Sequence, residues 1–235
     1  MHSSVDAVTL DFYQTLVFHR DGRGRGRVLM EYLERQGLEP APWEHQILYD
    51  VFGHHDEAYS PHGSPEEKRA YRTALAGRVF ERMGIRLASA AVGAHADALW
   101  QILGPASLEV FPDVIETLQA LRARGLPLAV VSNWQSGLPH FCTELGLGSF
   151  LDHVLASGDL GVEKPDTGIF LEACERLGVP PERTLHVGDT YLDDYVGATS
   201  AGFQVVLIDR FGGAQPGDAP TIRDFTALLE LVGGG

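Results

Sequence analysis

The residues that could do chemistry in this chain of 235 residues follow directly after apolar, strand-like runs. Asp11 comes after the run Val5–Leu10, which is apolar and β-branched enough to be a buried strand, and Thr15 follows four residues later. In open α/β sheets, ligands bind at the carboxyl ends of the strands, so Asp11 stands where chemistry is usually done. An aspartate after a strand also often caps a turn, and this stretch alone leaves the two interpretations equal.

A second group of carboxylates follows another apolar run. The strand-like run Thr184–Gly188 leads into Asp189, and Asp193 and Asp194 come shortly afterwards. Hard oxygen ligands at this spacing suit Mg²⁺. The carboxyl-terminal part of the chain therefore predicts a metal site.

A hydroxyl and an amine stand at two comparable places. Ser132 and Asn133 follow the strand-like run Leu126–Val131, although Ser-Asn after a strand is also common as a helix cap. Lys164 precedes a proline and a helical pattern, and it is one of only two lysines among the 18 basic residues. We favour a functional lysine over a surface lysine for that reason.

The elements that must position these residues are readable from hydrophobic periodicity. Strand-like runs occupy about 5–10, 126–131, 152–157, 184–189 and 204–209, and helical spacing without a strand candidate fills about 28–103. The pattern predicts an α/β fold: a Rossmann-like core with a parallel sheet (residues 1–17 and 107–235) and an inserted helical cap (residues 18–106). A closing helix is expected from Thr221 to Val232.

Taken together and in order, these stretches resemble the four motifs of the haloacid dehalogenase-like hydrolase superfamily. Asp-x-x-x-Thr-Leu, Ser-Asn after a strand, Lys-Pro before a helix and Gly-Asp-x-x-x-x-Asp all occur in that order. The finer match, Gly-Asp-Thr-Tyr-Leu-Asp-Asp-Tyr, is similar to a subgroup related to the human hydrolase-domain-containing proteins.

The resemblance implies a role for each motif residue. Asp11 would be the nucleophile, oriented by Thr15, while Ser132 and Lys164 would bind and neutralise the transferred group, with Asn133 beside them. The resemblance also implies one Mg²⁺ held by Asp11, the Tyr13 carbonyl and Asp189, with Asp194 in support and Asp193 as the alternative. The helical insert would be the cap that selects substrates.

Tyr13 departs from the family pattern, which usually has a second aspartate there as general acid and base. A phosphohydrolase without that proton donor should act through an aspartyl-phosphate on a small anionic substrate with a good leaving group. The similar 2-haloacid dehalogenases have tyrosine at this place and need no metal, but they lack the carboxylate that Asp189 supplies here. We therefore expect a Mg²⁺-dependent phosphohydrolase, with a dehalogenase as the alternative and a non-catalytic binding protein as a third hypothesis.

Composition narrows the partners and the location. A net charge of −14 argues against a nucleic-acid binder, and no apolar run is long enough to span a membrane. Neither a secretion signal nor a paired cysteine motif is visible, so a cytoplasmic protein is expected, with its oligomeric state left open. His54, His55 and Asp56 have no recognised ligand spacing and are interpreted as part of a polar loop.

Overall fold

The computed structural model describes residues 4–22, 24–41, 64–134, 136–213, 217 and 219–233. Its main element is a six-stranded parallel sheet with the order β5-β4-β1-β6-β7-β8. The strands are β1 (Ala7–Leu10), β4 (Leu128–Ser132), β5 (His153–Ala156), β6 (Thr184–Gly188), β7 (Gln204–Ile208) and β8 (Thr221–Ile222). The predicted α/β class with a parallel sheet is confirmed.

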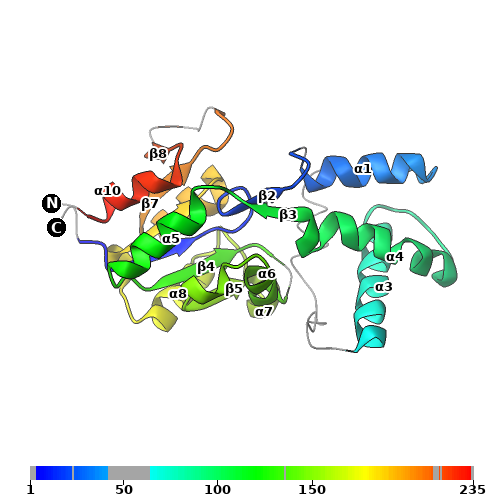
Figure 1. Ribbon diagram of the computed structural model, residues 1–235, viewed down its shortest axis with the longest axis horizontal. Helices are drawn as coiled ribbons and strands as arrows, with labels where there is room; N and C mark the ends of the chain where they lie inside the picture. Colours follow the sequence, from blue (N-terminus) through cyan, green and yellow to red (C-terminus); the bar gives the residue numbers. More distant parts are fainter. Residues whose placement is uncertain are drawn as a thin grey trace.

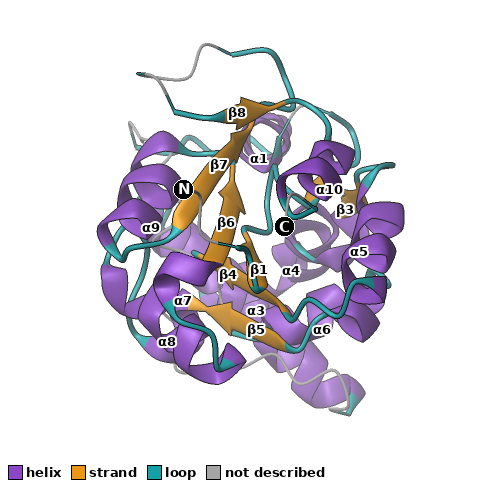
Figure 2. Ribbon diagram, turned by 90° about the vertical axis from the view of Figure 1, so that its left-hand side faces the viewer, coloured by secondary structure: helices purple, strands orange, loops and turns teal. Residues whose placement is uncertain are grey.

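Helices cover both faces of this sheet, which is why its inner strands are apolar on both sides. Figure 2 shows α8 (Thr167–Leu177) and α9 (Gly197–Ser200) on one face, and α5 (Val114–Ala123) and α10 (Leu228–Leu231) on the other. Alternate residues of β4 divide between the two cores, with Leu128 and Val130 in the larger one and Ala129 and Val131 in the smaller one.

A short antiparallel ribbon leads from the sheet to the helical segment. It pairs β2 (Val17–His19) with β3 (Leu108–Val110), and neither strand was predicted from the sequence. Figure 1 shows α1 (Arg25–Arg35), α3 (Pro65–Arg82) and α4 (Ser89–Leu103) beyond this ribbon, at the opposite end from the termini. β1 runs toward that end, so the carboxyl end of the sheet faces the helical segment.

The helical segment is stabilised by local sequence and by aromatic packing. Ser64 caps α3 by accepting from the Glu67 N–H, and the Glu67 carboxylate accepts from the Ser64 N–H in return. Tyr71 of α3 then packs edge-on against Trp100 of α4, with ring centroids 5.9 Å apart. Residues 42–63, part of the stretch in which helical spacing was expected, lie outside the described residues.

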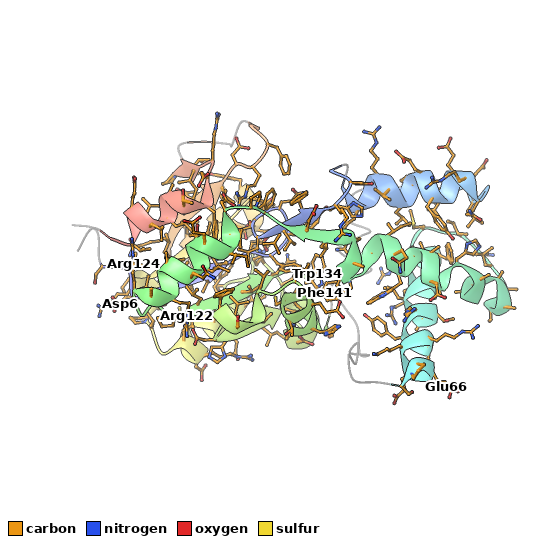
Figure 3. All side chains as sticks on the ribbon, viewed as in Figure 1. Asp6, Glu66, Arg122, Arg124, Trp134 and Phe141 are labelled. Atoms are coloured by element: carbon orange, nitrogen blue, oxygen red, sulfur yellow. The ribbon has the colours of Figure 1, made fainter. Side chains whose placement is uncertain are left out.

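An aromatic cluster joins the helical segment to the core. Trp100 packs against Phe141 of α6 (Leu138–Glu144) at 6.3 Å, and Phe141 packs against Trp134 at 5.6 Å. The ring centroid of Trp134 in turn lies 5.0 Å from that of Phe12, the residue that follows Asp11 in the chain. Figure 3 labels Trp134 and Phe141 at this junction. Packing in the helical segment is thereby connected to the loop that carries the first motif.

The expected closing helix from Thr221 to Val232 was wrong at its start, and the chain is helical from Phe225 to Leu231, as a 3₁₀ turn (Phe225–Ala227) followed by α10 (Leu228–Leu231). Thr221 and Ile222 form β8, which pairs with β7, and the regular helix is confined to α10. Apolar residues at helical spacing misled the prediction, because backbone pairing with β7 outweighs local periodicity here. Within the described ranges, no helix combines the length and the apolar character that crossing a bilayer requires.

Candidate active site

The sheet brings three of the predicted site residues to one edge. β1 lies between β4 and β6, and Asp11, Ser132 and Asp189 stand at the carboxyl ends of these three strands. The Asp11 N–H donates to the Val187 carbonyl at 2.8 Å, which ties the start of the first motif loop to β6. The strand-end positions therefore converge as the sequence predicted.

A buried ion triad forms the centre of the site. Lys164 Nζ lies 2.6 Å from Asp11 Oδ1 and 2.6 Å from Asp194 Oδ1, and Ser132 Oγ donates to the same Asp11 oxygen at 3.0 Å. Lys164 is 4% exposed, Asp11 6% and Asp194 0%, so water screens these charges little. A buried charge needs a partner to replace its lost hydration, and here the lysine partners both carboxylates.

Burial and charge act on the triad's pKa values in opposite senses. Burial raises the pKa of Asp11, and Lys164 opposes that rise. Burial alone would also raise the pKa of Asp194, but Lys164 and a hydrogen bond from His186 outweigh it and hold that pKa below its usual range. Burial lowers the pKa of Lys164, yet Asp11 and Asp194 outweigh burial and raise it. Lys164 is therefore a fixed positive charge and Asp194 a fixed negative one.

Asp194 receives four hydrogen bonds from protein donors. Its Oδ2 accepts from the Thr190 N–H at 2.9 Å and from Thr190 Oγ1 at 2.8 Å. Its Oδ1 accepts from Lys164 and, at 3.1 Å, from Nε2 of His186. An ionised carboxylate offers about four acceptor positions, so these donors occupy all of them.

The backbone around Asp194 is shaped to admit its side chain. Residues Tyr191–Val196 form a short π-helix, a rare turn that is frequent at functional sites. A Cβ atom at Gly188 would lie 2.1 Å from Asp194 Cγ, so no residue larger than glycine fits without moving the carboxylate. Close packing against Asp194 thus explains why glycine occupies position 188 in the Gly-Asp pair.

Asp189 completes a cluster of three carboxylates. One oxygen of Asp11, one of Asp189 and one of Asp194 lie within 4.8 Å of one another. Burial, together with the charges of Asp11 and Asp194, raises the pKa of Asp189 well above its usual range. A single lysine cannot balance three carboxylates, of which Asp11 and Asp194 are buried and Asp189 is partly buried, whereas a hard divalent cation with oxygen ligands can. The donor set therefore fits Mg²⁺.

Asp193, the alternative ligand in the sequence analysis, does not belong to this carboxylate group. It is half-buried on the same π-helix, next to the fully buried Asp194. Burial raises the pKa of Asp193 to about 6, with Lys164 acting in the opposite direction. The structure thus favours Asp194 over Asp193 as the carboxylate that belongs to the site.

Asn133 contacts the lysine loop. Its Oδ1 accepts from the Lys164 N–H at 2.7 Å, and its Nδ2 donates to the Lys164 carbonyl at 2.9 Å. The same loop packs closely on Gly197, where a Cβ atom would lie 3.0 Å from Pro165 Cα. Asn133 therefore fixes the backbone from which the lysine extends.

Thr15 is buried, but its expected contact with Asp11 is not seen. Its Oγ1 has no hydrogen-bond partner within the part of the chain that the structure describes. Its carbonyl instead accepts from Nη2 of Arg210 at 2.8 Å, and Nη1 of that arginine lies 2.6 Å from Asp113 Oδ2. Thr15 thus connects the first motif loop, through its backbone, to the loop after β7.

Tyr13 lies where the helical segment begins. Its hydroxyl accepts from the Arg25 N–H at 3.4 Å, and the Arg25 guanidinium lies 4.3 Å from the centre of the Trp134 ring. Burial raises the pKa of Tyr13, although Arg25 opposes the rise, so the phenol stays protonated at neutral pH. Arg25 is thus buried against two aromatic rings, those of Tyr13 and Trp134.

Sequence reasoning missed the side chains that support the triad: Thr9, His186 and Thr190. Strand alternation could have indicated His186, because Leu185 and Val187 belong to the opposite face of β6. Its partner could be found only from strand register. The cap residues His54, His55 and Asp56 lie outside the described residues.

With this fold and this site, the chain belongs to the haloacid dehalogenase-like hydrolase family, whose model matches residues 5–202. It is 42% identical over 125 residues to mouse haloacid dehalogenase-like hydrolase domain-containing protein 3, covering 53% of this chain and 45% of that protein. It is 36% identical over 160 residues to the glyceraldehyde 3-phosphate phosphatase of Methanopyrus kandleri, covering 63% and 64%. Both matches cover less than two thirds of the relative.

Solved structures agree on the fold. A phosphatase of this family from Thermococcus onnurineus superposes with a TM-score of 0.66 at 23% identity, covering 98% of this chain and 99% of that one. A 2-haloacid dehalogenase from Pseudomonas syringae gives a TM-score of 0.64 at 26% identity, covering 97% and 98%. The two superpositions are about equally good, so the choice between the two chemistries depends on the site.

The close packing of Gly188 on Asp194 makes a testable prediction. Gly188→Ala should destabilise the fold by about 1–3 kcal/mol, because the new methyl group overlaps the buried carboxylate. Gly93→Ala in α4 is the control, since no atom lies within 4 Å of its Cβ position and alanine favours a helix. Urea unfolding of both variants measures the difference. Equal stability of the two variants would contradict the described packing.

Proposed function

We propose that the chain is a Mg²⁺-dependent phosphohydrolase that acts through an aspartyl-phosphate on a small phosphorylated substrate with a good leaving group. The observation that carries this proposal is the excess of negative charge: Lys164 pairs with two buried carboxylates, Asp11 and Asp194, and a third, Asp189, lies in the same cluster. Displacement of a halide by Asp11 needs no cation, and a second buried carboxylate beside the nucleophile would hinder it. Transfer of a phosphoryl group needs positive charge in the site.

In this proposal Asp11, Lys164 and Ser132 have distinct tasks. A carboxylate oxygen of Asp11 attacks phosphorus, the bond from phosphorus to the leaving oxygen breaks, and its electron pair departs with the leaving group. Lys164 and the Ser132 hydroxyl hold Asp11 and neutralise the charge of the phosphoryl oxygens. Water then cleaves the acyl phosphate, which releases inorganic phosphate and restores the Asp11 carboxylate.

Asp11, the Tyr13 carbonyl and Asp189 would hold the Mg²⁺. Asp194 would support the site through Lys164, because its acceptor positions are occupied by protein donors. When bound, the ion supplies charge neutralisation for the nucleophile and the phosphoryl group. The helical segment, residues 18–106, is proposed to be the cap that selects the substrate, since the carboxyl end of the sheet faces it.

The alternative function, a 2-haloacid dehalogenase, is favoured by one observation. Tyr13 occupies the place of the family's usual acid, so this position offers a phenol and no carboxyl group. The Tyr13 hydroxyl contacts the start of α1. The structural similarity to the Pseudomonas syringae dehalogenase is compatible with this alternative. Both functions use Asp11 as the nucleophile, so they differ in the cation and in the leaving group.

Measuring phosphate and halide release side by side separates the two functions. We expect the chain to release phosphate from p-nitrophenyl phosphate and acetyl phosphate only with Mg²⁺, and to release no chloride from 2-chloropropionate. Chelation should abolish phosphate release, and added Mg²⁺ should restore it. Chloride release in excess chelator would establish the dehalogenase instead, and no release of either product would favour a binding protein.

The role of Asp11 as the nucleophile is tested in the same assay by a matched pair of variants. Asp11→Asn should lose turnover without unfolding, because an amide is a poor nucleophile. Asp224→Asn should keep turnover, since asparagine can cap the Thr226 N–H as aspartate does. Substantial activity of folded Asp11→Asn would contradict the assignment.

Tyr13 makes a separate prediction about leaving groups. Without a carboxylic acid at this place, aryl and acyl phosphates should be cleaved far faster than alkyl phosphates wherever phosphoryl transfer limits the rate. Tyr13→Asp should raise the ratio of alkyl to aryl rates by up to about 10²–10⁴, the usual contribution of general acid catalysis. A ratio of rates within one variant cancels any loss of folded enzyme caused by the smaller side chain.

Tyr13→Phe is the control, because it keeps the ring and removes only the hydroxyl. Its ratio should equal that of the parent. A lower ratio in Tyr13→Phe would mean that the phenol itself donates the proton. A parent rate that is flat across leaving groups, with no change in Tyr13→Asp, would place the donor elsewhere.

A further inference from the structure

A buried line of hydrogen bonds leads from strands β1 and β6 into the ion triad. Thr9 of β1 and His186 of β6 are register partners on neighbouring strands, and Thr9 Oγ1 lies 2.9 Å from Nδ1 of the histidine. The other ring nitrogen, Nε2, lies 3.1 Å from Asp194 Oδ1. All three residues are 0% exposed, so this line of hydrogen bonds is closed off from solvent.

The chemistry of the partners assigns the proton on the ring. Asp194 is ionised and can only accept, so the ring nitrogen that faces it, Nε2, must carry a hydrogen. Thr9 then holds Nδ1, and the ring of Phe170 packs edge-on against the imidazole with centroids 5.0 Å apart. The imidazole is thus held by a hydrogen bond at each ring nitrogen and by the packing of Phe170.

Fixing the ring also fixes the Asp194 carboxylate. Thr190 holds Oδ2 through its N–H and its hydroxyl, and His186 holds one side of Oδ1. The remaining acceptor position on Oδ1 is the one that binds Lys164 at 2.6 Å. With both oxygens restrained, the ammonium has one place in which it contacts Asp194 and Asp11 together.

We infer that His186 is a positioning residue: with its Nε2–H it orients Asp194, and through Asp194 it holds the Lys164 ammonium against the nucleophile Asp11. Thr9 supports this role by setting the orientation of the ring. His186 does not touch the reacting atoms, and its effect on turnover rests on the proposed phosphohydrolase function. The position of the ring proton and the hydrogen bond to Asp194 do not depend on that function.

The expected consequence falls on kcat more than on KM. Residues that orient a site's charged groups from behind typically change activity by about 10–100-fold when they are removed. His186→Leu should show a loss of kcat in that range, since it deletes the donor to Asp194 and fills the buried position with an apolar side chain. His186→Gln should recover most of the rate, because its amide N–H₂ can stand near the position of Nε2.

Two further variants complete the set. Thr9→Val keeps the shape of the strand and removes only the hydroxyl, so the ring should lose its orientation and kcat should fall by a few-fold. His140→Gln is the matched control: that histidine also pairs with a carboxylate, Glu144 at 2.7 Å, but on α6 and outside the triad. It should leave kcat and KM unchanged.

The test combines kinetics on p-nitrophenyl phosphate with Mg²⁺, thermal unfolding of each variant, and ¹⁵N NMR of the imidazole of His186. The inference predicts a proton on Nε2 in the parent, a change in that signal in Thr9→Val, and the rate order parent, His186→Gln, His186→Leu. A parent ring protonated on Nδ1 alone would overturn it. So would equal losses in His186→Leu and His186→Gln that simply follow their loss of stability.

Failure of the proposed function gives a different result. If the parent releases no phosphate, the NMR spectrum alone decides the inference. An Nε2 proton whose signal changes in both Thr9→Val and Asp194→Asn supports the positioning line. A signal that is insensitive to Asp194→Asn overturns the line, because the hydrogen bond to the carboxylate would then be absent.

Discussion

The structure depends on one buried ammonium. Lys164 contacts Asp11 and Asp194 at 2.6 Å each and is nearly excluded from water, so it supplies the positive charge that both buried carboxylates need. Breaking such an ion pair by removing one partner typically costs about 3–5 kcal/mol, because a buried charge is left uncompensated. Much of the surrounding architecture serves to keep this lysine in one place.

Separate parts of the fold converge on that lysine. β1 supplies Asp11, the end of β4 supplies Ser132 and Asn133, and the π-helix after β6 supplies Asp194. Asn133 holds the lysine backbone while Asp194 holds its side chain, so both ends of the residue are restrained. The third carboxylate, Asp189, then exceeds the charge that the lysine can balance, and this excess is the physical basis for the proposed cation.

Sequence reasoning predicts the residues that follow strands and misses those that depend on register. Asp11, Ser132 and Asp189 were found because strand ends in a parallel sheet meet at one edge. His186 was missed because its role depends on Thr9 lying opposite it on β1, 177 residues away. Thr221–Val232 was taken for a helix because its apolar residues recur at helical spacing, although pairing with β7 begins there. The role of Thr15 differs in the structure, because its carbonyl rather than its hydroxyl is bound.

We infer that the cluster of Asp11, Asp189 and Asp194 beside one lysine creates a site for a divalent cation. Calorimetric titration of the parent and of Asp189→Asn with Mg²⁺ tests it most directly, because it needs no substrate. We expect Mg²⁺ to bind the parent and this binding to be lost in Asp189→Asn, while thermal unfolding shows the variant to be folded. A parent that binds no Mg²⁺, or a folded Asp189→Asn that binds it as well as the parent does, would contradict the account.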